Sequence, residues 1–129
     1  MTNPDDARVP RPQPTVEEMD DLLQFLPALA QPGRSFVTAP LQYMPDVEAF
    51  FRRAGNGWWS DPDYEPAAAA RMLADDEAVR RATLREVRAM LTCCVRGERF
   101  CDGYWEGILQ AGRVTAPLRR LPVLRQEDG

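Results

Sequence analysis

Histidine and lysine are both absent from this chain of 129 residues, and all 16 basic side chains are arginine. Without histidine the chain lacks the usual general base near pH 7, the commonest metal ligand and the base of most serine and cysteine triads. The three cysteines, Cys93, Cys94 and Cys101, form no Cys-x-x-Cys pair of the kind that holds zinc. We therefore expect free thiols, no metal and no cofactor, and the sequence favours a protein that is not an enzyme.

The sequence also lacks any apolar run near the roughly 18 residues that a membrane-spanning helix needs. Its first fourteen residues are rich in proline, without the basic start and apolar stretch of a signal peptide. The formal net charge of −4 makes the chain a poor nonspecific binder of nucleic acid. We expect a cytoplasmic protein that uses neither a membrane nor nucleic acid as its main partner.

What the sequence does contain is enough apolar side chain for one ordinary domain. Hydrophobic residues make up 44% of the composition, which suffices for a core without help from disulfides or metals. Prolines crowd the first fourteen positions. We predict a loose tail over residues 1–14, a single domain over 15–125 and a flexible C-terminus over 126–129.

Apolar residues recur at helical spacing along most of that domain. Two capping boxes, Thr15 with Glu18 and Thr83 with Glu86, mark the starts of two helices, and Pro122 is expected to limit the length of the last one. There are no repeats, no heptads and no alternation of strands with helices. The pattern predicts an all-α fold, a single compact domain of five to seven short helices, with a short extended arm near residues 34–44.

The expected core consists of apolar residues on these helical stripes. Its members are Leu22, Leu26, Phe50, Leu84, Val87, Leu91, Phe100, Trp105, Ile108, Leu109 and Leu121.

The segment VRGERFCDGYW, residues 95–105, gathers arginines, carboxylates, glycines and aromatic rings between two amphipathic runs. We predict a helix corner in which Phe100 fills the core and Asp102 caps the second helix. Arg96 and Arg99 would tie the corner by donating hydrogen bonds to helix C-terminal carbonyls and to nearby carboxylates.

The same segment resembles the C-terminal signature of a family of small bacterial proteins of unknown function. The signature is an Arg-x-x-Arg-Phe-x-x-Gly pattern, here Arg96, Arg99-Phe100 and Gly103, preceded by Leu-Thr at 91–92 and followed by Gly112 and Leu-x-Arg-Leu at 118–121. The resemblance extends over about residues 16–124 and implies no activity. Members often carry histidine after the motif glycine, where this chain has Tyr104.

The leading functional prediction is a protein–protein interaction module, such as an inhibitor or adaptor of the kind that phages and mobile elements carry. It rests on the missing catalytic sets and on aromatic and arginine residues of the types that dominate interface hot spots. A second copy of the chain is one candidate partner. The expected binding residues are Trp58, Trp59, Arg96, Arg99, Asp102, Tyr104 and Glu106.

Two alternatives stay open. Glu98, Asp102 and Glu106 recur every four residues and would share one face of a continuous helix, where they could join Arg96 and Arg99 to bind or transform a small anionic ligand. The second alternative is weak nucleic-acid binding through the C-terminal arginines, Arg113, Arg119, Arg120 and Arg125.

Overall fold

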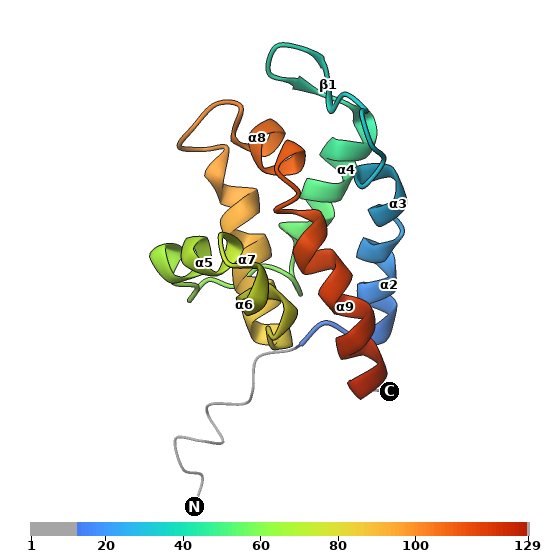
Figure 1. Ribbon diagram of the computed structural model, residues 1–129, viewed down its shortest axis with the longest axis vertical. Helices are drawn as coiled ribbons and strands as arrows, with labels where there is room; N and C mark the ends of the chain where they lie inside the picture. The colour runs from blue at the N-terminus through green and yellow to red at the C-terminus, as the bar shows by residue number, and fades with distance from the viewer. Residues whose placement is uncertain (1–12, 129) are drawn as a thin grey trace, which may run out of the picture.

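A computed structural model describes residues 13–128 of the chain, with side chains described as far as residue 126. The expected tail over residues 1–14 therefore lies almost wholly outside the described residues. Within them the protein is a single helical domain with one small sheet, which confirms the predicted fold class (Figure 1).

Two helices of 14 residues form the centre of the domain. They are α7 (Leu84–Gly97) and α9 (Thr115–Asp128). The shorter helix α4 (Pro45–Ala54) packs against α7, while α2 (Val16–Leu23) and α3 (Leu26–Leu29) pack against α9. On the other side lie α5 (Pro66–Leu73) and α6 (Asp76–Arg80), and α8 (Tyr104–Gln110) follows α7 at its C-terminal end (Figure 1).

Most helix starts are encoded locally. Both predicted capping boxes form: the Thr15 and Thr83 hydroxyls accept hydrogen bonds from the backbone of Glu18 and Glu86, whose side chains bond back. Asp75 caps α6 through two backbone N–H groups. Helices α4 and α5 instead begin with a proline, which has no N–H to leave unpaired.

The arm near residues 34–44 is a small antiparallel hairpin, β1 (Val37–Ala39) paired with β2 (Gln42–Tyr43). Leu41 makes its turn with a left-handed φ of 62° and is exposed. The hairpin stands at the end of the molecule near α8 (Figure 1), and it delivers Tyr43 into the interior.

The last helix differs from the prediction, because α9 continues through Pro122 to Asp128 instead of ending before it. A proline inside a helix removes one backbone hydrogen bond. Burial of Leu118, Leu121 and Leu124 on the inner face compensates for that loss, while Pro122 faces outward. Residues 126–128 thus belong to the helix.

The core agrees with most of the predicted stripe positions. Leu22, Phe50, Val87, Leu91, Ile108, Leu109 and Leu121 are buried, and Leu26, Leu84 and Trp105 are partly buried against them. Phe100 was placed in the core wrongly, since 84% of it is exposed.

Candidate functional site

The corner between α7 and α8 is a real break in the helix. Helix α7 ends at Gly97 and α8 begins at Tyr104, so the residues between them form turns. Glu98, Asp102 and Glu106 would share one helical face only in a continuous helix, and that condition is not met. Two glycines, as the sequence shows, mark this break, and Gly103 adopts a left-handed φ of 83° that side chains disfavour.

Glu98 has the central role at the corner. Its carboxylate accepts hydrogen bonds from the backbone N–H of Gly103 at 3.0 Å and of Trp105 at 2.9 Å. It also accepts a hydrogen bond from the Tyr43 hydroxyl, with 3.0 Å between the two oxygens. Asp102, the expected cap, is exposed, and the N-cap position belongs to Gly103. A carboxylate at a helix N-terminus is favoured by the helix dipole as well as by these bonds.

The first turn of α8 is thereby fully paired. The N–H of Glu106 donates to the Tyr43 hydroxyl at 3.3 Å, and those of Tyr104 and Gly107 reach backbone carbonyls in the preceding turns. Two N-terminal N–H groups of this seven-residue helix thus donate to side chains outside it. The pKa of Tyr43 is raised to about 12, mainly by burial and also by the hydrogen bond to the negative Glu98.

Trp105, rather than Phe100, is the aromatic residue that packs into the interior at the corner. Its ring stacks on Phe51 with centroids 4.1 Å apart and an interplanar angle of 4°. Its indole N–H donates to the carbonyls of Cys94 and Val95, at 3.0 and 3.2 Å, near the C-terminal end of α7. This single side chain therefore joins α4, α7 and α8, and it satisfies carbonyls that were expected to be bonded by arginine.

The two signature arginines do not tie the corner, and that prediction is wrong. Within residues 13–128, the guanidinium groups of Arg96 and Arg99 make no hydrogen bond and no ion pair, although the two backbones are bonded to each other. The Arg96 guanidinium instead lies over the ring of Tyr64, 5.1 Å from its centroid. Arg99 is exposed beside Phe100. The tight turn that bonds the N–H of Phe100 to the carbonyl of Gly97 turns this ring outward.

Tyr104 packs against α7 where Gly97 leaves room for it. A Cβ at Gly97 would lie 2.2 Å from the tyrosine ring, so a glycine is required at this position. The Tyr104 hydroxyl lies near the Cys93 thiol. Burial raises the pKa of both groups.

A groove runs beside this corner between α4 and α7. It has a volume of about 460 Å³ and is lined by Glu48, Phe51, Arg52, Val95, Glu98, Arg99 and Trp105. Its apolar floor is made by the stacked rings and Val95. Arg52 on α4 and Arg99 after α7 stand on its two sides, and no ion pair holds either of them among the described residues.

The remaining predicted residues are separated from one another. Trp59 is 3% exposed and belongs to the core, whereas Trp58 is 45% exposed. Glu106 contributes its backbone to the corner, while its side chain accepts a weak bond from Gln110. Among the C-terminal arginines, Arg125 is paired with Asp20 on α2 at 2.8 Å.

Sequence reasoning missed Tyr43, Phe51 and Arg52 as parts of this site. All three come from segments about 50 residues before the corner, and no local spacing connects them to it. The available signal was an aromatic pair followed by an arginine pair in α4, the helix that begins at Pro45.

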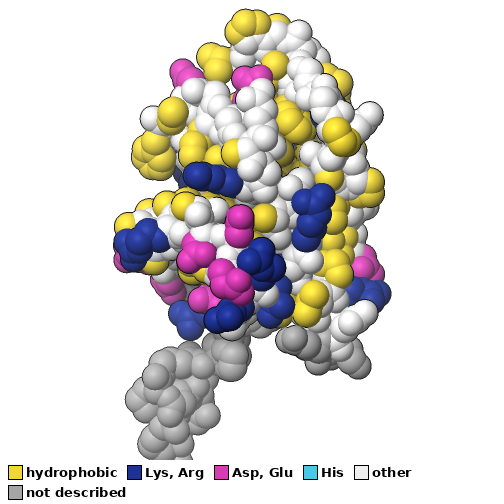
Figure 2. Space-filling model, in the orientation of Figure 1, with side chains coloured by type: hydrophobic (Ala, Val, Ile, Leu, Met, Phe, Trp, Pro, Cys, Tyr) yellow, Lys and Arg dark blue, Asp and Glu magenta, His cyan; other side chains and the backbone are white. Residues whose placement is uncertain are grey.

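Hydrophobic side chains gather on the surface around the α7–α8 corner and the hairpin (Figure 2). Over residues 13–128, no cluster of three or more Cys, Asp or Glu side chains is arranged to hold a metal ion. In the same range no helix combines the length and apolar character needed to cross a membrane.

Comparison with protein families matches residues 14–127 to the model of one family, which is described as a family of unknown function. No curated protein and no solved structure matches the chain.

Proposed function

The chain belongs to the family of unknown function DUF6508, and we propose from its own surface that it is a protein–protein interaction module. Its partner would be bound by the α4–α7 groove together with Phe100, which follows groove residue Arg99 in the chain. In this proposal Phe100 and Arg99, which the sequence had suggested as structural residues of the corner, contact the partner instead.

The observation that carries the proposal is the exposure of Phe100. This ring is 84% exposed although water contact with so much apolar surface is unfavourable, and a buried site is filled by Trp105 a few residues away. The turn that presents it is held by backbone groups. The N–H of Phe100 bonds to the carbonyl of Gly97, and the N–H groups of Gly103 and Trp105 bond to the Glu98 carboxylate. A rigidly presented aromatic ring loses little conformational entropy on binding, which is how interface anchors act.

The groove indicates the chemistry of the partner. An apolar side chain would rest on Trp105 and Phe51, and carboxylates on either side of it would pair with Arg52 and Arg99. The groove also contains two carboxylates of opposite charge to these arginines. Glu48 is exposed, whereas both oxygens of Glu98 already accept hydrogen bonds within the corner. We therefore propose a partner surface that carries acidic residues around an apolar one.

Site-specific crosslinking tests the proposal in the cell. A photoreactive phenylalanine analogue at position 100 should give a discrete crosslinked product when the full chain is expressed in its native host. The same analogue at Arg71, an exposed residue of α5, is the matched control. A product at twice the mass of the chain would identify a second copy as the partner. Equal products at both positions, or none at position 100, would contradict the proposal.

The identified partner then allows a quantitative test with purified proteins. Phe100→Ser and Arg99→Gln should each weaken binding at least about tenfold, as expected for an anchor residue and a paired arginine. Both should leave the free energy of unfolding within about 0.5 kcal/mol of the wild type, because the side chains are exposed. Arg71→Gln should change neither quantity. Unchanged affinity in both Phe100→Ser and Arg99→Gln would rule out this surface.

A further inference from the structure

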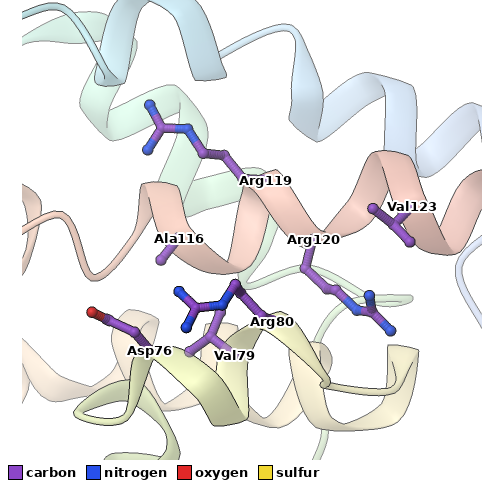
Figure 3. A pocket seen from close by; sticks show the side chains of 7 residues that line it. All are labelled: Asp76, Val79, Arg80, Ala116, Arg119, Arg120 and Val123. Atoms are coloured by element: carbon purple, nitrogen blue, oxygen red, sulfur yellow. The ribbon is translucent and has the colours of Figure 1, made fainter.

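A second hollow lies away from the corner, between α6 and α9. It has a volume of about 460 Å³ and is lined by Asp76, Val79, Arg80, Ala116, Arg119, Arg120 and Val123. None of these residues lines the α4–α7 groove. Figure 3 shows Arg80 and Arg120 extending through the space between the two helices, with Arg119 projecting from the other side of α9.

We infer that this hollow is a binding site for a small organic anion that joins a phosphate or carboxylate group to a compact apolar body. Two arginines, Arg80 and Arg120, extend into it against one lining carboxylate, Asp76, while Arg119 only borders it. Guanidinium groups match the planar pairs of oxygens on phosphates and carboxylates, so the charge at the site favours an anion. The volume falls within the range of small-molecule sites.

The fold holds these arginines in place but leaves some of their N–H donors available to a ligand. Arg120 donates from Nε to the carbonyl of Ala82 at 2.8 Å, which fixes its stem and leaves its terminal nitrogens for a ligand. Arg80 pairs with Glu77 at 2.9 Å on a side chain that is 67% exposed. An exposed pair of this kind contributes little, and a ligand anion can replace it. Arg119 makes only a long contact of 3.5 Å to Thr115.

The apolar half of the ligand has its own surface in the same hollow. Val123 is one of the few large apolar side chains exposed among the described residues, at 44%. It lies farther along α9 than Ala116, and Val79 on α6 lies across from Ala116 but is only 3% exposed, so Val123 supplies most of the exposed apolar surface (Figure 3). A short hydrocarbon or aromatic group placed there would cover apolar area that now contacts water. This pairing of charge with an apolar wall separates the site from an ordinary solvated arginine cluster.

Titration with simple probes tests the inference on the full chain. Phenyl phosphate should bind saturably with a dissociation constant of about 1 mM or tighter, a realistic strength for so small a ligand. Binding should shift the methyl resonances of Val79 and Val123. Inorganic phosphate and phenol, which each carry half of the required chemistry, should bind at least about tenfold more weakly. Benzoate tells whether a carboxylate can replace the phosphate.

Variants complete the test. Arg80→Gln and Arg120→Gln should each weaken phenyl phosphate at least about fivefold, and Val123→Thr should weaken it while leaving inorganic phosphate unchanged. Arg71→Gln on α5 is the matched control and should have no effect. The inference is wrong if phenol binds as tightly as the anions, if no probe saturates by about 10 mM, or if Arg71→Gln weakens binding as much as the site variants. Circular dichroism of each variant guards against loss of the fold.

Discussion

Helices α7 and α8 begin in opposite ways. At α7 the cap is local: Thr83 and Glu86 bond each other's backbone within a single turn. At α8 the N-cap residue is Gly103, which has no side chain to contribute, and the bonds come from Glu98 and from Tyr43 on the distant hairpin. A local cap stabilises one helix, whereas the cap of α8 also joins α8 to α7 and to the hairpin.

The cap of α8 also holds the exposed loop between α7 and α8. A loop closed by distant partners is held in one shape, and its outward residues are held with it. At the α7–α8 corner those outward residues include Arg99 and Phe100. The start of α7, by contrast, presents no large exposed apolar side chain. The non-local cap thus fixes the backbone of the surface that we propose for partner binding.

The largest expected effect comes from removing the non-local cap. Glu98→Ala deprives two backbone N–H groups and one hydroxyl of a charged acceptor, so we expect the free energy of unfolding to fall by about 3 kcal/mol. Urea denaturation measures this change. Asp102→Ala is the control, because that neighbouring carboxylate is exposed, and it should change stability by less than about 0.5 kcal/mol. Equal losses in both variants would contradict the assignment of the cap to Glu98.

Tyr43→Phe removes one arm of the same network and should cost about 1–2 kcal/mol at neutral pH. The pKa of Tyr43 is raised to about 12 in the folded protein, above its ordinary value of 10. Its contribution to stability is therefore full below pH 10 and is lost as the pH rises from 10 through 12. Stability of the wild type should fall more steeply over this range than that of Tyr43→Phe. Parallel pH profiles would show that this hydroxyl is not linked to folding.

Thr83→Ala tests the local cap and should have the smallest of the three effects, about 1 kcal/mol. The loss should be confined to α7, so the fluorescence of Trp105, which reports the stacking at the corner, should keep its native spectrum. Combining Thr83→Ala with Glu98→Ala should give an additive loss, because the two caps share no partner. A strongly non-additive double variant would mean that the two helix starts are coupled.

The contrast between the two caps also explains what could be predicted from the sequence. Thr83 and Glu86 form a pattern within four residues, and the helical stripes and the extended arm were equally local. The outward position of Phe100 could not be predicted in this way, since Phe100 and Trp105 are both aromatic and both border the break. Only the positions of Phe51 on α4 and of the α7 carbonyls determine that tryptophan, with its N–H donor, enters the interior.

The extension of α9 is the second case in which tertiary contacts override a local signal. Pro122 is a strong helix breaker in isolation. Burial of the leucines on either side of it keeps the helix intact as far as Asp128. The position of a proline on the exposed face is what makes this arrangement tolerable.

Amide hydrogen exchange at Trp105 tests the central claim most directly. If Glu98 holds the corner, this N–H should exchange slowly in the native protein, although it lies in the first turn of a short helix where an uncapped amide faces water. In Glu98→Gln, whose neutral amide is a weaker acceptor, its protection should fall markedly while amides in the middle of α7 keep theirs. Fast exchange in the wild type, or unchanged protection in Glu98→Gln, would contradict a corner fixed by Glu98.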